Sequence, residues 1–578
     1  MNSYSKTALA AAICTALSAG HAGAATFNVT NTNDAGAGSL RDALSQAGAN
    51  AEADIIDLST VSGQTISLTS GQLEIDGDEV TINGAGSTLD AGGDSRVLAT
   101  YYSDVTLNDL TITGGDVESL QPVRGISQGG AGGGIYAIEG SLDVNDSEVS
   151  GNSADVGGGV FFASEYGSLN LNDSMVSGNT AMYAGGGVYA DGKYANVTVS
   201  GTEISSNTAG RAAGGIAAYS FDGNVSLVDS IVSNNTVTGG GLPTRAFSEG
   251  RGALDAAREA QRDGSPWETL GDGPGGPTGY AGGAGIYGLY GDIEINRSTI
   301  SGNSADVGAG VVAYGTQGSI LVDSSTISGN SATFFGGAGI LRAKYDMQVR
   351  NSTISGNSSG DINGGLVMYS YLDSQQDGES GSPRGTAPRT VSIEFTTITD
   401  NSSNDIGGLG ISSDISIPIT ASVISGNSAA TDPDIGFEGG SFAQADLSFS
   451  LVGVDSTSGT LNFDAASTSL LGQDPLIGPL ADNGGPTRTH LPGDGSPLLD
   501  AIPPGSAGCG TAVTDDQGGQ ARPFNGACDI GAVERGLIGP PPAAVSVPVM
   551  DRIGLLLMAG LLGLAGFFGF RRRSETKS

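Results

Sequence analysis

Histidine, cysteine and basic side chains are scarce in this sequence, and each shortage excludes a class of function. Of the two histidines in 578 residues, His490 lies in the body of the chain, so any Ser/His/Asp triad would have to use it. Lys and Arg number 24 against 61 Asp and Glu, which gives a net charge of -37. We expect no nucleic-acid partner, because phosphate binding needs clustered Lys and Arg.

Aromatic residues are also few, at 6%, whereas glycine occupies 97 positions and 38% of the residues are hydrophobic. Such a chain is too rich in turn residues for a helical protein and too apolar for a disordered one. Many short strands separated by glycine turns fit this composition best.

The first 24 residues have the three parts of a secretory signal peptide. Lys6 supplies the basic start, Thr7 to Ala19 the apolar core, and Ala22-Gly23-Ala24 the small-residue cleavage site. We expect export, with cleavage leaving Ala25 as the first residue. Cys14 is lost with the signal segment.

The two remaining cysteines, Cys509 and Cys528, are 19 positions apart. Disulfides persist in the oxidising compartments that an exported chain reaches, and closing a loop of this size stabilises a fold by about 3 kcal/mol. Two thiols with no nearby histidine fall short of a tetrahedral metal site. We therefore predict a disulfide between Cys509 and Cys528.

A repeat, most often 27 or 28 residues long, fills the middle of the chain. Nine segments related to STISGNSA carry an asparagine at a turn: Asn152, Asn179, Asn207, Asn235, Asn303, Asn330, Asn357, Asn401 and Asn427. The residue three before each asparagine is always Val or Ile, from Val149 to Ile424, and the residue five before is always Ser or Thr, from Ser147 to Ser422. Because strand side chains alternate, we expect both positions to face inward, with the hydroxyls and the asparagines stacked as ladders.

These repeats predict an all-β fold, a right-handed parallel β-helix solenoid with three short strands in each turn, over residues 101–470. One turn alone buries little, so stability must come from contacts between neighbouring turns. Two steps between asparagines are longer than the rest. They locate polar, Pro- and Gly-rich insertions at 240–279 and 371–389, which we expect to leave the coil as loops.

Both flanks of the repeats resemble known families. FNVTNTNDAGAGSLRDALSQAGANAEADIIDL resembles the CSLREA-type entry region of bacterial surface β-helix proteins, which implies a capping helix over Ser39 to Ala47 and first turns within 25–100. Residues 471–535 contain DPLIGPLADNGGPTRTHLPGDGSPLLDA and DDQGGQARPFNGACDIGAVE and are similar to the choice-of-anchor Q domain. This second resemblance implies display at the cell surface and no particular reaction.

The end of the chain predicts a membrane segment. A Pro-rich linker, 536–549, precedes the tail 550–578, in which 18 uncharged residues from Ile553 to Phe570 would span about 27 Å as a transmembrane helix. Arg571, Arg572 and Arg573 follow, and they are expected to stay cytoplasmic while the coil lies outside. The tail, with Pro548, resembles IPTL-type sorting tails, which implies a sorting protease. A plain membrane anchor is the alternative.

A parallel β-helix in an exported protein resembles the pectate-lyase-like superfamily, and this resemblance raises the question of polysaccharide cleavage. The GHG and RIK tripeptides typical of galacturonan hydrolases are absent from the sequence. Asp146 and Asp173 occupy equivalent positions on successive turns, about 4.8 Å apart by strand spacing, and are candidate Ca²⁺ ligands; solvated surface carboxylates are the alternative. Arg297 in the same column is a candidate base only if carboxylates converge on it. For His490 we expect a structural hydrogen bond.

Three tyrosines near the GGGVYA-like strands, Tyr136, Tyr189 and Tyr287, are candidates for stacking on sugar rings or for packing at the corners of the coil. Two functions stay open. The first is a non-catalytic, exported surface protein that adheres to glycans, cations or another cell surface. The second is a polysaccharide lyase or hydrolase with an unrecognised active site. Neither requires a cofactor other than calcium.

Overall fold

The structure, a computed structural model, describes residues 24–49, 53–117, 130–239, 282–315, 318–343, 345–370, 390–413, 415–438, 444–464 and 469–535, which all lie in one compact unit ending at Arg535. The insertions predicted at 240–279 and 371–389 lie outside the described residues, as do the signal segment, the linker and the tail with Pro548 and Arg571 to Arg573. Among the described residues, no helix has the length and apolar character needed to cross a membrane.

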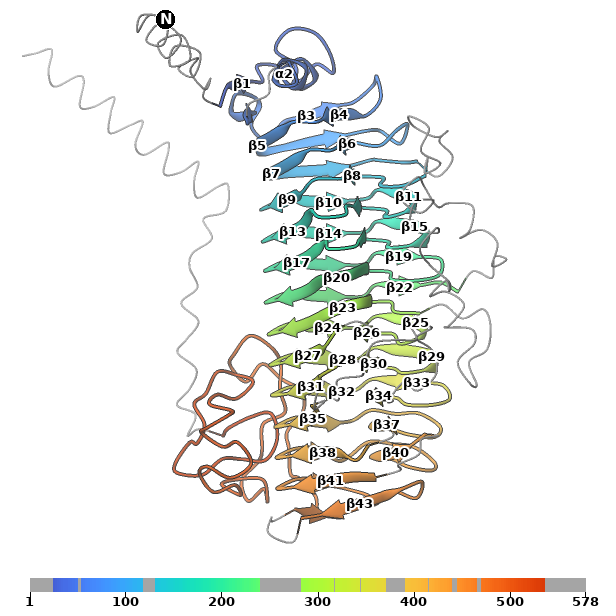
Figure 1. Cartoon of the computed structure of the whole chain (residues 1–578), viewed down its shortest axis with the longest axis vertical. Helices are drawn as coiled ribbons and strands as arrows, with labels where there is room; N and C mark the ends of the chain where they lie inside the picture. Colours follow the sequence, from blue (N-terminus) through green and yellow to red (C-terminus); the bar gives the residue numbers. More distant parts are fainter. Residues whose placement is uncertain are drawn as a thin grey trace, which may run out of the picture. The chain divides into compact units, whose positions relative to one another are not determined.

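The described chain winds as a coil of short strands whose turns stack in parallel (Figure 1). Strands pair with their equivalents one turn earlier and one turn later, so that Val149 lies opposite Val176 and Leu169 opposite Val197. This pairing confirms the predicted parallel β-helix architecture. Its handedness stays a prediction.

Three columns of strands form one continuous sheet. The first column consists of β4 (Leu73–Asp76), β6 (Leu98–Tyr101), β8 (Ile135–Ile138), β12 (Val160–Ala163), β16 (Val188–Gly192), the first parts of β20 (Ile216–Val228) and β23 (Ile286–Asn296), β26 (Val311–Gly315), β30 (Gly339–Ala343), β34 (Leu366–Ser370), β37 (Leu409–Ser413) and β40 (Ile435–Phe437).

The second column consists of β1 (Thr26–Asn28), β2 (Asp54–Asp57), the first parts of β5 (Glu79–Asp90) and β7 (Asp104–Thr113), β9 (Leu142–Asn145), β13 (Ser168–Asn172), β17 (Asn196–Ser200), the second parts of β20 and β23, β27 (Ile320–Asp323), β31 (Met347–Arg350), β35 (Val391–Glu394), β38 (Ile417–Thr420), β41 (Gln444–Ser448) and β43 (Thr460–Phe463).

The third column carries the repeated VSGN and ISGN segments. It consists of β3 (Thr65–Ser67), the ends of β5 and β7, β10 (Glu148–Ser150), β14 (Met175–Ser177), β18 (Glu203–Ser205), β21 (Ile231–Ser233), β24 (Thr299–Ser301), β28 (Thr326–Ser328), β32 (Thr353–Ser355), β36 (Thr397–Thr399), β39 (Val423–Ile424), β42 (Leu451–Val452) and β44 (Leu470–Leu471).

A fourth column, which the three-strand reading of the repeat missed, forms a separate parallel sheet directly after the asparagines. Its strands are β11 (Ser153–Val156), β15 (Thr180–Ala184), β19 (Thr208–Ala209), β22 (Thr236–Val237), β25 (Ser304–Val307), β29 (Ser331–Phe335) and β33 (Ser358–Ser359). The prediction of three strands was wrong because these segments are short and lack a clear alternation of apolar and polar residues, as in Thr208-Ala209.

The interior of the coil matches the predicted inward positions. The nine aliphatic residues three before the asparagines, from Val149 to Ile424, are all 0% exposed. The hydroxyls form the expected ladder, in which the backbone nitrogen of Ser147 donates to Oγ of Ser174 at 3.0 Å. The asparagines form a second ladder, in which Nδ2 of Asn152 donates to Oδ1 of Asn179 at 3.0 Å. Each turn therefore buries its polar turn groups with hydrogen-bond partners supplied by the next turn.

The predicted capping helix is present as α2 (Leu40–Ala47) at the start of the coil (Figure 1), and the short helix η1 (Ser59–Val61) follows β2. Ser39 is its N-cap, and the Ser39 side chain accepts a hydrogen bond from the backbone nitrogen of Asp42. Leu40, Ala43, Leu44 and Ala47 are buried against the first turns. Such a cap covers apolar residues and strand edges that an open end would expose.

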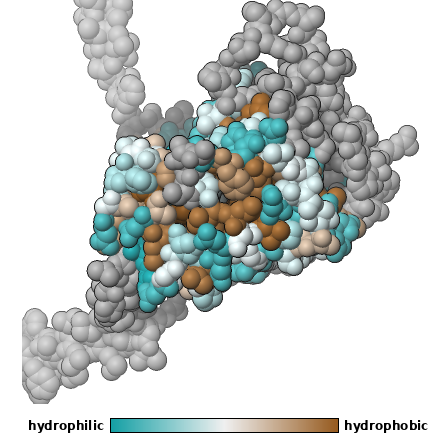
Figure 2. Space-filling model, turned by 90° about the horizontal axis from the view of Figure 1, so that it is seen from below, coloured by the Kyte–Doolittle hydropathy of each residue, from teal (hydrophilic) through white to brown (hydrophobic). Residues whose placement is uncertain are grey.

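The described residues cover the other end of the coil less completely. Figure 2 looks onto this end and shows apolar side chains gathered among hydrophilic ones. Val454, Phe463, Leu471 and Leu476, from the last turns and the segment after them, are each more than a third exposed. The two ends of the coil therefore differ: a helix closes the first, and the second presents apolar surface.

Residues 471–535 have almost no regular secondary structure and contact the third column. Their contacts run to outward-facing hydroxyl and amide groups of the coil: Thr326 Oγ1 donates to the Arg488 carbonyl, Thr353 Oγ1 to Gln517 Oε1 at 2.6 Å, and the Ala532 nitrogen to Thr397 Oγ1 at 3.1 Å. We call residues 471–535 the terminal block. After Leu471, which ends β44, it packs on the coil as a lateral layer and does not continue it.

Candidate functional site

The candidate calcium ligands Asp146 and Asp173 both lie at turns where the backbone is left-handed, with φ of 48° and 47°. The equivalent residues of other turns, among them Asp229, Arg297 and Asn351, have the same conformation. The left-handed turn alone accounts for the residue types found in this column, and no bound ligand is needed to explain them. Among the described residues, no three His, Cys, Asp or Glu side chains are placed to hold a metal ion together. The calcium site stays a prediction that rests on two carboxylates.

Arg297 forms an ion pair with Asp229 of the preceding turn, and its Nε donates to Asp229 Oδ1 at 2.7 Å. This hydrogen bond raises the pKa of Arg297 above its ordinary value. A guanidinium that holds its proton more tightly is unsuited to act as a general base. Arg297 therefore serves as the ion-pair partner of Asp229 on the preceding turn.

His490 is almost fully buried between the terminal block and the coil. Its Nδ1 lies 2.7 Å from the Gly478 carbonyl, and its Nε2 lies 2.8 Å from Oγ of Ser355. Burial lowers the pKa of His490 below its ordinary value, which favours the neutral ring. Both ring nitrogens are occupied, as the structural role predicted from the sequence requires.

The predicted tyrosines divide into buried and partly buried members of one aromatic stack. Tyr136 stacks on Phe161 with ring centroids 5.3 Å apart, and Phe161 stacks on Tyr189 at the same distance. Tyr136 and Tyr287 are buried, and Arg96 lies over the Tyr136 ring. The stack fills the space outside the first column, so Tyr136 and Tyr287 serve in packing and are not available to a sugar.

A different pair of tyrosines, which the sequence reading missed, is exposed. Tyr166 and Tyr194 lie in the turns that join the first column to the second, on successive turns of the coil, with ring centroids 5.2 Å apart and an interplanar angle of 16°. Tyr166 is 72% and Tyr194 37% exposed. Lys193 lies over the Tyr194 ring at 4.8 Å, and a hydrogen bond with Glu165 raises the pKa of Tyr166. We call these four residues the tyrosine patch.

The same turn position carries exposed tyrosines elsewhere in the coil. Tyr102 follows β6 and Tyr345 follows β30, and both are more than a third exposed. Singly exposed apolar residues are common at protein surfaces, whereas exposed apolar groups that lie in contact with one another, such as Tyr166 and Tyr194, often mark contact sites. The tyrosine patch could have been predicted from the sequence, because Tyr166 and Tyr194 are one repeat apart and therefore occupy the same place on neighbouring turns.

A second candidate lies outside the first column, at Glu438. Asn363 Nδ2 donates a hydrogen bond to Glu438 Oε1, and the Tyr369 hydroxyl lies 3.4 Å from Oε2. Burial raises the pKa of Glu438 to about 7, and the nearby charge of Asp405 adds to this effect. Oδ1 of the fully buried Asn363 has no hydrogen-bond partner among the described residues. A carboxyl group with a pKa near neutral can exchange a proton at physiological pH.

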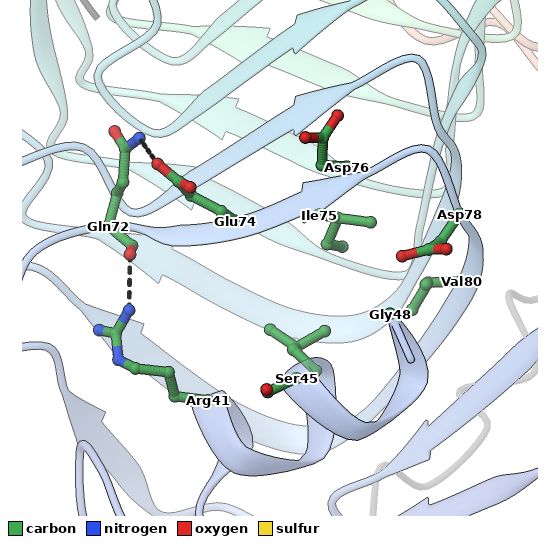
Figure 3. Close-up of a pocket in the computed structure, with 10 residues that line it drawn as sticks. Arg41, Ser45, Gly48, Gln72, Glu74, Ile75, Asp76, Asp78 and Val80 are labelled. Carbon is green, nitrogen blue, oxygen red and sulfur yellow. Dashed lines mark hydrogen bonds between the residues drawn. The ribbon is translucent and has the colours of Figure 1, made fainter. Parts of the chain in front are cut away.

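A cavity of about 410 Å³ opens below the capping helix. Arg41 and Ser45 of α2 line one side, and the acidic residues Glu74, Asp76 and Asp78 line the other (Figure 3). Arg41 donates to the carbonyls of Gln72 and Gly71 and pairs with Asp34. These contacts tie the helix to the first turns, and the cavity is the seam between them.

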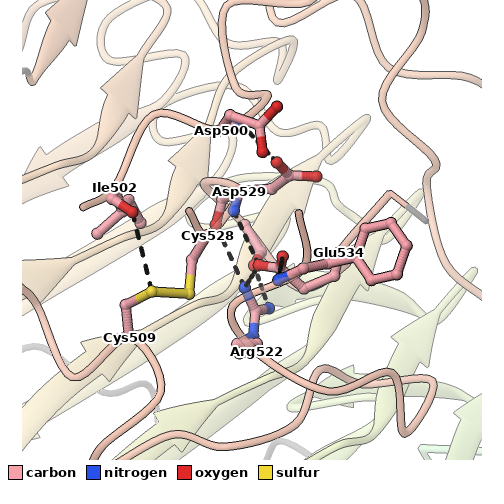
Figure 4. Close-up of a disulfide and its surroundings, with 9 residues drawn as sticks. Asp500, Ile502, Cys509, Arg522, Cys528, Asp529 and Glu534 are labelled. Atoms are coloured by element: carbon pink, nitrogen blue, oxygen red, sulfur yellow. Dashed lines mark hydrogen bonds and ion pairs between the residues drawn. A yellow bond between two sulfur atoms is a disulfide. The ribbon is translucent and has the colours of Figure 1, made fainter. Parts of the chain in front are cut away.

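The terminal block is held by a buried charge centre and a disulfide (Figure 4). Arg522 and Glu534 form an ion pair at 2.6 Å with both side chains inaccessible to solvent, and Arg522 lies over the Phe395 ring of the coil. Burial raises the pKa of Glu534 to about 7, while the charge of Arg522 acts in the opposite direction. Cys509 and Cys528 are bonded, with their Cα atoms 6.0 Å apart. These features stabilise a block that has little secondary structure.

No protein-family model matches this chain, and no curated protein is significantly similar to it.

Proposed function

We propose that this chain is an exported β-helix protein that is displayed at the cell surface through its C-terminal tail. We propose further that it binds polysaccharide at the tyrosine patch without cleaving it. Export and anchoring are supported by the signal-like N-terminus and by the apolar tail that ends in Arg571, Arg572 and Arg573. The choice-of-anchor Q and IPTL-type resemblances agree with this location. An adhesive role needs a long surface with repeated contact points, which the stacked turns provide.

The observation that carries the proposal is the exposed stacked pair Tyr166 and Tyr194. Tyrosine combines a broad apolar ring with a polar hydroxyl, and a pyranose ring likewise has an apolar C–H face and a polar rim. Glu165 and Lys193 place an acceptor and a donor beside the rings. A few polar groups around an apolar contact are typical of sites that orient a small ligand.

The test is binding of the purified exported chain to uronate-containing and neutral polysaccharides, with and without Ca²⁺. We expect Tyr166→Ala with Tyr194→Ala to weaken binding about tenfold or more, equivalent to about 1.4 kcal/mol. Ile231→Ala, which removes an exposed apolar side chain from the third column, is the control and should bind like the parent. Equal binding by the double variant and the parent would contradict the proposal.

A polysaccharide lyase or hydrolase is the second candidate function, favoured by the near-neutral pKa of Glu438. In this mechanism Glu438 would donate a proton to the leaving oxygen of a glycosidic bond. New reducing ends or unsaturated products in the same incubations would establish it. Such activity should disappear in Glu438→Gln and persist in Glu294→Gln, a partly buried carboxyl of β23.

A further inference from the structure

The first described strand begins beside a buried carboxyl group. Asp54, the first residue of β2, is 2% exposed, and its Oδ1 accepts a hydrogen bond from the backbone nitrogen of Ala25 at 3.1 Å. Its other oxygen, Oδ2, is buried and has no hydrogen-bond partner among the described residues. A buried carboxylate is unfavourable unless both its charge and its lone pairs are compensated.

The backbone fixes this contact. The Ile55 nitrogen donates to the Ala25 carbonyl at 2.8 Å, and the next residue, Thr26, lies opposite Ile55 in the parallel pairing of β1 with β2. The nitrogen of Ala25 is thus held at the end of a strand ladder, directed to Asp54. Ala24, one residue earlier, lies before the ladder and is exposed.

The surroundings of Asp54 are acidic. Asp76 and Asp78 lie close enough for the charges of Asp54 and Asp76 to add to the effect of burial in raising the pKa of Asp78. The nearby cation of the capping helix, Arg41, pairs with Asp34 and with backbone carbonyls of the first turns. A positive charge at the Ala25 nitrogen would therefore relieve repulsion as well as satisfy Asp54.

We propose that Ala25 carries the free α-ammonium group of the mature chain and that Asp54 is its buried binding site. The inference rests on the export step of the proposed function, because a peptidase must cut between Ala24 and Ala25. Hydrolysis of that bond consumes one water and leaves a carboxylate on Ala24 and an amine on Ala25, which takes up a proton. The amide of the precursor offers one N–H, whereas the ammonium offers three and a charge, enough to reach both Asp54 oxygens.

Removal of the signal peptide then gives Asp54, in the first turn of the coil, a positively charged partner. The precursor keeps a half-satisfied buried carboxylate at this point, and the mature chain replaces it with an ion pair at the edge of the sheet. The position of the cut is also specified by the fold: a cut elsewhere would leave the ammonium out of reach of Asp54 or remove part of the strand.

The test begins with N-terminal sequencing of the chain purified from exporting cells. A first residue other than Ala25 overturns the inference, and an uncut N-terminus on the exported chain overturns the predicted signal cleavage as well. The α-amine is then acylated at pH 7. The mature chain has only three lysines, Lys193, Lys344 and Lys577, whose ordinary pKa lies well above that of an α-amine, so the label is selective.

We expect the Ala25 amine to react at least about tenfold more slowly in the folded parent than in Asp54→Asn. The reason is that pairing with Asp54 keeps the amine protonated, and a protonated nitrogen cannot attack the reagent. Asp57→Asn, the same change at the far end of β2, should react like the parent. The exposed Lys193 reacts slowly at pH 7, and an equal slow rate at Lys193 in all three proteins reports equal reagent access. If Asp54→Asn does not fold, the parent in urea supplies the unprotected rate. Equal rates at Ala25 in the folded and the unprotected states would overturn the proposal.

Discussion

The third column of the coil can be divided into two halves that share one repeat but differ in what lies outside them. On β10, β14, β18 and β21 the outward residues four before the asparagines are Glu148, Met175, Glu203 and Ile231, and all are partly or fully exposed. On β28, β32, β36 and β39 the equivalent residues are Thr326, Thr353, Thr397 and Val423, and all are buried under or beside the terminal block.

The inward residues of the two halves do not differ in this way. Val176 in the uncovered half and Ile327 in the covered half are both fully buried and lie in the same ladder position. The difference teaches that the repeat specifies the coil, while the outward position between its constant residues specifies what binds to the coil. A threonine there offers a hydroxyl to a partner and still favours a strand.

The largest effect should come from the inside, where the halves are equal. Ile327→Asp buries a charge with no designed partner, which costs several kcal/mol, and Val176→Asp should cost the same. Denaturant unfolding followed by circular dichroism measures both. If one half tolerated the change and the other did not, the two halves would not share the same interior. Parent-like melting of Ile327→Asp would show that the inward column is assigned wrongly.

Removal of the buried cation should affect the covered half alone. Arg522→Met leaves Glu534 buried without its partner, and we expect the terminal block to lose about 3–5 kcal/mol of stability. Hydrogen exchange of the block and of the coil, measured separately, should show faster exchange in the block while β10 and β14 stay protected. Arg488→Met, an exposed arginine of the same block, is the control. Unchanged protection in Arg522→Met would contradict the importance of the charge centre.

A smaller, pH-dependent effect should come from Glu438, which directly follows β40 in the first column. Its pKa of about 7 exceeds the ordinary value of 4.5, so between these pH values the folded state holds a proton that the unfolded state has released. The contribution of Glu438 to the free energy of unfolding should therefore be greatest below pH 4.5 and fall as the pH rises through 7. Glu438→Gln should flatten that decline in thermal melts between pH 5 and 8. An unchanged slope would contradict the raised pKa.

The smallest effect compares the two halves directly. Thr353→Val removes the hydroxyl that donates to Gln517, and we expect a loss of about 1 kcal/mol in the stability of the docked block. Thr299→Val, at the equivalent place on β24 outside these contacts, should change stability by less than about 0.5 kcal/mol. Hydrogen exchange of the block in the two variants gives the comparison. Equal effects would mean that the outward hydroxyls do not recognise the block.

Much of the coil follows from the sequence because its signals are local and repeated. The inward aliphatic column, both ladders and the capping helix begun by Ser39 depend on residues within one turn or at a fixed step. The fourth column escaped because strands such as Thr208-Ala209 are too short for alternation to be read. The docking of Gln517 on Thr353 and the pKa of Glu438 depend on residues far apart in the chain, and no local pattern reports them.

The asparagine ladder also has a direction. Each side-chain amide donates towards the next turn, so the amide dipoles align along the coil with their positive ends facing the last turns. At the far end, Nδ2 and the backbone nitrogen of Asn427 both donate to Oδ1 of Asp434, at 2.9 and 3.2 Å. Burial raises the pKa of Asp434 above its ordinary value, and the hydrogen bonds from Asn427 act in the opposite direction, as donors at a helix N-terminus do for an anion. The asparagine ladder thus ends on a carboxyl group at Asp434, while the strands of the coil continue through β42 and β44.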